Sequence, residues 1–184
     1  MHRIANIAVA FMVAATLAKP CGATVVDQGQ NGFTIQQKLH IAAATDKVYA
    51  ALLAPGKWWS SDHTFSHSAA NLALDARAGG CFCETLPGGG SVQHATVAIA
   101  MPGAMLRLRG PLGPFQGQGV DAALTFSLKA AGDGTDLTLD NVVGGYMQGG
   151  FGKWPQAADG MLSDLVEHLK YYAENGKSEP PPAK

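Results

Sequence analysis

Two cysteines and a histidine are the residues whose types most directly suggest chemistry in this chain. Cys81 and Cys83 are two positions apart, so on a β-strand both side chains would point to the same face. If 87–90 forms a four-residue turn, Cys83 lies opposite His94 on the next strand, and the three side chains share one face. Thiolates and imidazole are ligands of zinc and copper, so this arrangement would suit a metal-binding protein.

A simpler interpretation of the same cysteines is that they are free, buried thiols. A Cys-x-Cys spacing on a strand lacks the geometry of a zinc knuckle, and no fourth ligand is indicated. Two cysteines so close together would also strain a disulfide, although an oxidising compartment would favour one. Because free cysteine is among the most buried residue types, we expect neither a metal nor a cofactor here.

The segment 57–71 carries two histidines and two adjacent tryptophans. His63 and His67 have the spacing of two metal ligands on one helix face, but the serine and threonine residues around them favour a loop. Trp58 and Trp59 either roof a ligand cavity or pack against the preceding helix, because aromatic side chains serve both purposes.

The composition predicts one folded domain and excludes several partners. The chain has 184 residues, of which 47% are hydrophobic and 15% charged, so extensive disorder is excluded. The formal net charge is -1 and the basic residues are scattered, which argues against nucleic acid or an anionic membrane as a partner. The 23 glycines exceed the average share and predict many tight turns in a sheet-rich fold.

Hydrophobic periodicity predicts a strand, a short helix, a meander of strands and a long closing helix. Residues 33–41 alternate with the period of a half-buried strand, and a helix follows from Thr45 until Pro55 stops it. The closing helix runs from Pro155 to about Asn175 and carries one apolar stripe. Between the two helices, turn residues separate six further predicted strands, at 72–77, 80–86, 91–100, 105–109, 120–128 and 135–143.

This order of elements resembles the helix-grip fold of the SRPBCC or START-like superfamily. The resemblance is carried by 41–59, where a Val-Tyr helix ends in a tryptophan pair, by 77–84, a Gly-Gly turn into a strand, and by the closing helix over 153–172. Within the superfamily, the chain is most similar to the family related to the activator of heat-shock-protein ATPase, which includes polyketide-cyclase-like proteins. The resemblance implies an α+β fold: a curved seven-stranded antiparallel sheet wrapped around a long C-terminal helix, with one or two short helices after the first strand.

The resemblance also implies an apolar cavity between the closing helix and the sheet. Glu84 shares a strand face with Phe82, which the family likeness places toward the cavity, so its carboxylate would orient a ligand or act as a base. The alternative is an ion pair with Arg107 or Arg109. The glycine-rich segment 144–152 is interpreted as a flexible gate. The predicted ligand-binding residues are Trp58, Trp59, Phe82, Glu84, Phe126, Asn141, Tyr146, Met161 and Leu165.

These observations lead to one predicted function and two alternatives. We expect a periplasmic or secreted protein that binds a small apolar or amphipathic molecule in an internal cavity. The first alternative is a cyclase- or hydrolase-like enzyme that acts on a hydrophobic small molecule through a cavity acid or base such as Glu84 or His94. The second is a metal-binding protein that uses Cys81, Cys83 and His94. No catalytic residue follows from the resemblance, because one fold hosts many functions.

The first 23 residues have the pattern of a cleaved secretory signal. A basic start precedes the apolar run 4–18, which is too short to span a bilayer, and small residues stand before a cut after Ala23. An exported chain would not meet a cytosolic chaperone and would keep no membrane anchor after cleavage, so we do not expect a co-chaperone role. The expected organisation is a signal peptide over 1–23, a leader over 24–32, the SRPBCC-like domain over 33–175 and a disordered tail over 176–184.

We predict that the protein is exported and cleaved near Ala23, because signal peptidases cut after small residues. N-terminal sequencing of protein recovered from outside the cytoplasm checks this. An intact Met1 on protein found only in the cytoplasm would contradict it.

Overall fold

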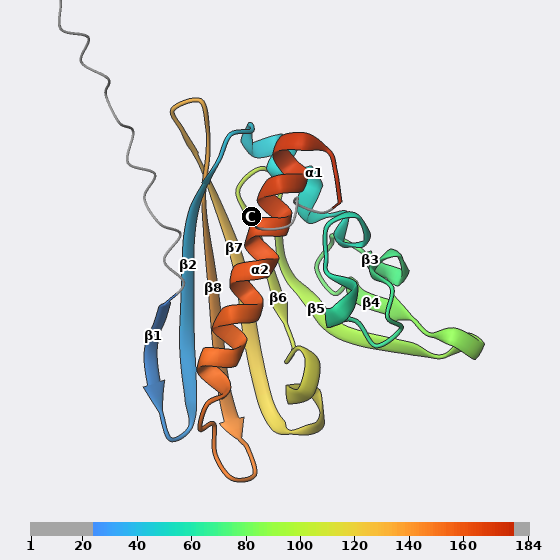
Figure 1. The fold of residues 1–184 in the computed structure, drawn as a ribbon, viewed down its shortest axis with the longest axis vertical. Helices are drawn as coiled ribbons and strands as arrows, with labels where there is room; N and C mark the ends of the chain where they lie inside the picture. The colour runs from blue at the N-terminus through green and yellow to red at the C-terminus, as the bar shows by residue number, and fades with distance from the viewer. Residues whose placement is uncertain (1–23, 179–184) are drawn as a thin grey trace, which may run out of the picture.

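The computed structural model describes residues 24–178 and shows one antiparallel sheet curved around a long helix (Figure 1). The predicted α+β helix-grip architecture is confirmed, with eight strands in these residues instead of seven, in the order β1-β2-β8-β7-β6-β5-β4-β3. The strands are β1 (Thr24–Gly29), β2 (Gly32–Ile41), β3 (Leu72–Leu74), β4 (Cys81–Thr85), β5 (Ser91–Met101), β6 (Met105–Arg109), β7 (Gly119–Ala131) and β8 (Gly134–Tyr146).

Two α-helices and five 3-10 turns complete the described residues. The predicted signal peptide (1–23) and the end of the predicted tail (179–184) lie outside them. The α-helices are α1 (Thr45–Leu52) and α2 (Trp154–Asn175), and the 3-10 turns are η1 (Pro55–Lys57), η2 (Ser61–His63), η3 (Ala69–Asn71), η4 (Pro87–Gly89) and η5 (Gly113–Gly117).

The additional strand, β1, is formed by residues that the sequence assigns to a leader (24–32). It pairs with β2 through a turn at Gln30 and Asn31. The side chains from Val26 to Gln28 are all exposed, so no alternation of apolar and polar residues marks this strand. Its backbone hydrogen bonds to the edge of β2 hold it in place instead, and such pairing depends little on side-chain type.

The hairpin of β7 and β8 forms the centre of the sheet. Both strands have 13 residues and pair along their whole length, with Phe126 opposite Leu139. Their buried residues alternate with more exposed ones, as a sheet with one covered face requires. The turn between them contains Gly132 with a φ of 56°, which glycine adopts without strain.

α2 covers the inner face of this sheet, and Figure 1 shows it lying across β2, β8 and β7. Pro155 lies in its first turn, and Gly176 ends it with a left-handed φ of 68°. Gln37, fully buried on β2, donates its side-chain amide at 3.2 Å to both the backbone carbonyl and the carboxylate of Asp159. This link sets the start of the helix against the sheet. The buried residues of the helix are Pro155, Ala158, Leu162, Leu165, Val166, Leu169 and Ala173.

Between α1 and β3 the chain passes through η1, η2 and η3 next to the strands that bend away from β2 and β8 (Figure 1). Trp58 is buried in this segment, and its indole N–H donates to the carbonyl of Ala51 in α1 at 2.7 Å. The carbonyl of Trp58 in turn contacts Nδ1 of His168 on α2 at 3.2 Å. Trp58 therefore joins the two helices, which is the packing role considered for it above.

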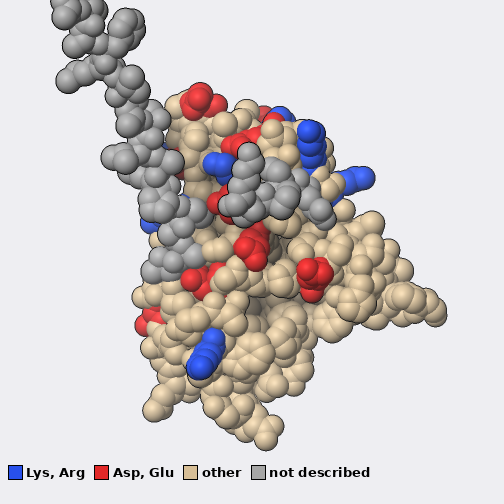
Figure 2. Space-filling model, in the orientation of Figure 1, with Lys and Arg blue, Asp and Glu red and all other residues tan. Residues whose placement is uncertain are grey.

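Charged side chains are unevenly distributed over the face of the molecule shown in Figure 2. On the face shown in Figure 2, acidic and basic residues intermingle over the upper part, while the side that carries β4 and β5 is nearly free of both. The surface is hollowed between that side and α2. None of the described helices is long and apolar enough to cross a membrane.

Replacing Gly160 with alanine should raise the free energy of unfolding by about 1 kcal/mol. Gly160 lies inside α2, and a Cβ added there would meet no other atom within 4 Å. Denaturant unfolding measures the change. Gly176→Ala is the matched control, because its φ of 68° disfavours alanine and should lower stability by about 1 kcal/mol. An unchanged or less stable Gly160→Ala variant would contradict the prediction.

Candidate functional site

A cavity of about 750 Å³ opens between α2, the inner face of the sheet, η5 and the segment around η2. Its volume falls within the ~300–1,000 Å³ typical of small-molecule sites. The wall is mostly apolar, and its aromatic side chains come from three separate parts of the chain. The lining residues are Trp59, Asp62, His63, Thr64, Phe65, His94, Leu112, Gly113, Pro114, Phe115, Gln116, Gly117, Ala122, Asn141, Val143, Trp154, Ala157, Ala158 and Met161.

One polar residue of this wall, His94, forms a buried carboxylate–imidazole pair with Glu84, which lies behind it. Nε2 of His94 lies 2.8 Å from Oε2 of Glu84, and only 6% of the His94 side chain and none of the Glu84 side chain is exposed. The backbone N–H of Phe65 donates to Oε2 at 3.1 Å, and that of Ser66 donates to Oε1. Both oxygens of the carboxylate are thus satisfied without solvent.

The register of β4 and β5 brings these two side chains together. Thr85 pairs with Ser91, so the connection has five residues instead of the four assumed above, and Cys83 pairs with Gln93. A slip of one residue moves a side chain to the other face of a sheet. His94 therefore lies on the inner face with Glu84, and the predicted pairing of His94 with Cys83 is wrong.

A β-bulge next to His94 adds to this effect. The register shifts between Phe82 and Cys83, so Phe82 pairs with Ala95 and His94 is left as the unpaired residue. His94 and Ala95 are consecutive and both buried, which regular alternation does not allow. Bulges often direct a side chain into a functional site, and this one directs an imidazole into a cavity.

The hydrogen bonds of Glu84 keep it ionised. Burial raises the pKa of this carboxyl, but hydrogen bonds from the side chain and backbone of Ser66, the backbone of Phe65 and the ring of His94 outweigh it, so the pKa lies below its ordinary value. An ionised carboxylate only accepts hydrogen bonds, so Nε2 of His94 carries the proton. In the neutral form of the imidazole, Nδ1 is then the hydrogen-bond acceptor.

Within residues 24–178, Nδ1 of His94 is in contact with a single polar group. The side-chain amide of Gln116 on η5 donates to it over a long distance of 3.4 Å. The ring is held between Phe82, with centroids 5.1 Å apart, and Phe65, at 5.9 Å. A ring fixed in this way presents one lone pair in a constant direction, which is the geometry of a general base or a hydrogen-bond acceptor for a ligand.

Cys81 and Cys83 form a disulfide, so the prediction of free thiols is wrong. Both lie partly exposed on the outer face of β4, opposite to Phe82 and Glu84. A disulfide offers no thiolate to a metal, and His94 is on the other face. The three residues therefore do not fit a metal site, and the described residues contain no other cluster of His, Cys, Asp or Glu that could hold a metal ion.

Of the nine predicted ligand-binding residues, Trp59, Asn141 and Met161 line the cavity. Phe82 and Glu84 lie directly behind His94 in the wall. Trp58, Phe126 and Leu165 are buried in the core without reaching the cavity.

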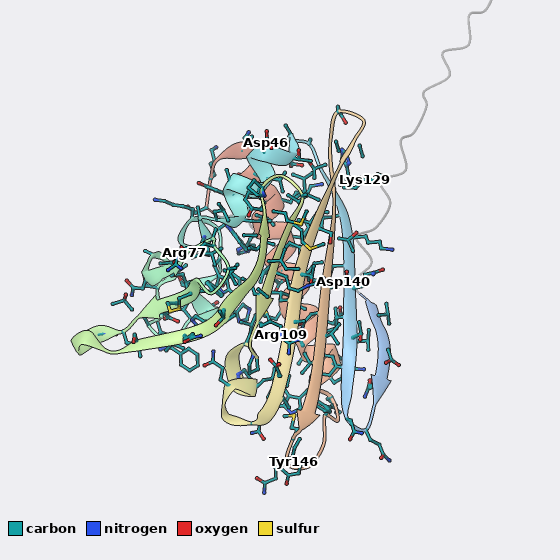
Figure 3. All side chains as sticks on the ribbon, turned by 180° about the vertical axis from the view of Figure 1, so that it is seen from behind. Asp46, Arg77, Arg109, Lys129, Asp140 and Tyr146 are labelled. Atoms are coloured by element: carbon teal, nitrogen blue, oxygen red, sulfur yellow. A yellow bond between two sulfur atoms is a disulfide. The ribbon has the colours of Figure 1, made fainter. Side chains whose placement is uncertain are left out.

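Tyr146 points away from the site, at the outer end of β8 (Figure 3), with 72% of its surface exposed. The predicted gate 144–152 contributes no residue to the cavity wall, and its Phe151 is buried against Phe33 with ring centroids 5.5 Å apart.

The alternative ion pair between Glu84 and an arginine does not form. Arg107 donates to the hydroxyl of Thr125, and Arg109 pairs with Asp121. Figure 3 shows Arg109 on the face of the sheet turned away from α2, whereas Glu84 is on the inner face.

Sequence reasoning missed the residues of η5, above all Phe115 and Gln116. They lie in the connection 110–118, whose glycines and prolines give no periodicity to interpret. Trp154 was also missed, although an aromatic residue at the start of an amphipathic helix and outside its buried stripe is a usable signal.

No family model matches the sequence, and no curated relative was found. The solution structure of the Aha1 dimer from Colwellia psychrerythraea is similar, with 17% identity over 79% of this chain and 98% of that chain, and a TM-score of 0.55. EF2215, a conserved protein of unknown function from Enterococcus faecalis, has 14% identity over 88% of this chain and 82% of that chain, with a TM-score of 0.60.

A third similar structure is DynU16, from the dynemicin biosynthetic locus. It has 19% identity over 78% of this chain and 48% of that chain, and a TM-score of 0.55. At these identities the likenesses establish only that this chain shares its fold with these structures.

Replacing Glu84 with glutamine should lower the free energy of unfolding at neutral pH by about 1–3 kcal/mol, because an amide cannot accept all the hydrogen bonds that converge on the carboxylate. The pKa of Glu84 is lowered in the folded state, so the carboxylate stabilises the fold above its ordinary pKa of about 4.3. This contribution is lost as the pH falls through the folded-state pKa.

Denaturant unfolding as a function of pH checks this prediction. The difference between wild type and Glu84→Gln should shrink in acid. Glu167→Gln, at an exposed position of α2, is the control and should change stability by less than about 0.5 kcal/mol at any pH. A difference for Glu84→Gln that does not depend on pH would contradict the assignment.

Proposed function

We propose that this protein binds one small apolar or amphipathic molecule in the cavity beside α2, outside the cytoplasm. The observation that carries the proposal is the cavity itself, about 750 Å³ in volume and lined mainly by aromatic and aliphatic side chains. Folded cores are normally packed without voids larger than a water molecule. A large apolar space with a few polar groups is the usual form of a ligand site.

Asn141 supports an amphipathic ligand. It lines the cavity from β8 with 8% of its surface exposed, and its side-chain amide has no hydrogen-bond partner within residues 24–178. Because no described side-chain nitrogen or oxygen is both buried and unpaired, this amide faces the cavity space, where a ligand carbonyl or hydroxyl can bind it. Asn141 would therefore set the position of the polar end of the ligand.

The charges of the wall favour a ligand without a formal charge. Its acidic residue is Asp62, and no lysine or arginine is among the described lining residues. A carboxylate or phosphate in the cavity would lose its hydration without gaining a cation, which is unfavourable. Fatty acids and phosphorylated metabolites therefore fit less well than neutral molecules.

The proposed location outside the cytoplasm rests on the sequence of the first 23 residues, with the disulfide as independent support. Disulfides persist in oxidising compartments such as the periplasm or the extracellular space. DynU16, one of the similar structures, comes from a biosynthetic locus, which agrees with a small organic molecule as the ligand.

We expect neutral apolar ligands to raise the melting temperature of the protein and to change its tryptophan fluorescence, because Trp59 and Trp154 line the cavity. A panel of sterols, uncharged lipids and aromatic polyketide-like compounds is the test. A panel in which no compound changes either signal would contradict the proposal.

Two tryptophan substitutions on α2 localise the binding. Ala157→Trp, at the exposed rim of the cavity, should weaken binding by at least tenfold, because the added ring occupies the entrance. Gln156→Trp, on the neighbouring exposed position that does not line the cavity, should bind like wild type.

A further inference from the structure

Glu84 fixes the direction in which His94 can act. The carboxylate accepts N–H groups from Phe65 and Ser66 as well as from His94, so it cannot rotate to release the ring. The bond between Nε2 and the carboxylate, at 2.8 Å, is a charge-assisted hydrogen bond. Its specific effect is to hold one imidazole nitrogen and leave the other, Nδ1, at the cavity wall.

The surroundings of Nδ1 define what it can bind. Its contact with Gln116 is long, at 3.4 Å, and Gln116 lies in a turn bordered by Gly113 and Gly117, so a ligand atom can replace it. The other titratable groups of the wall are Asp62 and His63, both exposed on η2. The polar side chains of the described wall therefore include a hydrogen-bond acceptor on His94, with the amide of Gln116 beside it, and a second amide on Asn141.

A neutral molecule with a hydroxyl group on an aromatic ring satisfies these conditions. The hydroxyl supplies a donor that can replace the long contact from Gln116 to Nδ1, whereas a carboxylate would oppose Nδ1 with a second acceptor. Aromatic rings from Trp59, Phe65, Phe115 and Trp154 line the cavity and suit a flat aromatic body.

We propose that His94 is a base that takes the proton of an aromatic hydroxyl bound in this cavity, and that Glu84 is its positioning residue. This inference rests on the proposed function, because it names the ligand class of the same cavity. The O–H bond of the ligand breaks, its electron pair stays on oxygen, and the proton forms an N–H bond at Nδ1. The imidazolium is then placed between the ligand oxyanion and the carboxylate of Glu84, which stabilises it. The amide of Gln116, within 3.4 Å of Nδ1, is positioned to donate to the oxyanion.

The experiment uses 4-nitrophenol, whose ionised form absorbs at longer wavelength than the neutral form. It is compared with 4-nitroanisole, which has the same ring but no proton to give. Tryptophan fluorescence measures binding of both compounds, and visible absorption measures the ionisation of bound nitrophenol as a function of pH. We expect both compounds to bind wild type, and the ratio of ionised to neutral nitrophenol to be at least tenfold higher for the bound than for the free compound at the same pH.

Variants assign the effect to the two residues. His94→Gln should bind nitroanisole but lose the tenfold enhancement, since an amide is not a base. Glu84→Gln should still bind nitroanisole, but it should enhance the ionisation of bound nitrophenol less than wild type does and shift its pH profile. If His94→Gln does not fold, Glu84→Gln alone tests the inference. His67→Asn, on an exposed residue outside the cavity whose φ of 57° asparagine tolerates, should behave like wild type.

Two results would overturn the inference and leave the proposed function intact. In the first, nitrophenol binds wild type but keeps the absorption of its neutral form, or nitrophenol bound to Glu84→Gln and His94→Gln is as ionised as nitrophenol bound to wild type. The other is failure of nitrophenol to bind while nitroanisole or another apolar compound does. If no apolar compound binds at all, the proposed function fails together with this inference.

Discussion

The buried negative charge of Glu84 is the constraint on which the site depends. A carboxylate without solvent is tolerated only where donors surround it, and here they come from Phe65, Ser66 and His94. These bonds tie the segment after α1 to β4 and β5, and this segment also carries Trp59 to the cavity wall. One ionised group therefore positions both an aromatic wall and an imidazole, so the shape and the polarity of the cavity depend on the same contacts.

The cavity itself follows from covering a strongly curved sheet with a single helix. α2 closes the side formed by β2 and β8, where Leu162 and Leu169 are fully buried. β5, β4 and β3 bend away from it (Figure 1), and the space between is bordered partly by small side chains such as Ala122 and Ala158. Filling this space would increase dispersion contacts and stability. The chain instead lines it with aromatic residues and an amide that faces the open space, which favours a binding site over an incompletely packed core.

Strand β4 separates two kinds of chemistry onto two faces. The outer face carries the disulfide between Cys81 and Cys83, and the inner face carries Phe82 and Glu84. Because side chains alternate along a strand, the disulfide brackets Phe82, which packs on the ring of His94. The cysteines therefore act on the geometry of the strand rather than on a ligand, and the acid–base group of the site is the pair on the inner face.

Periodicity in the sequence determined the elements: the alternating residues of β2, β7 and β8, the apolar stripe of α2 and the glycines and prolines between them are local signals that the fold retains. Alternation also placed Phe82 and Glu84 correctly on one face. The partner of Glu84 was decided only by the tertiary structure, because alternation within a strand carries no information on which residue of the next strand lies opposite. That depends on the length of the turn and on the bulge at His94, and one residue of error exchanges the faces. The sequence likewise could not predict that η5 forms part of the cavity wall, because this connection has no periodicity and contacts segments distant along the chain. Nor could it predict that Tyr146 points outward, because this depends on where β8 extends past the helix.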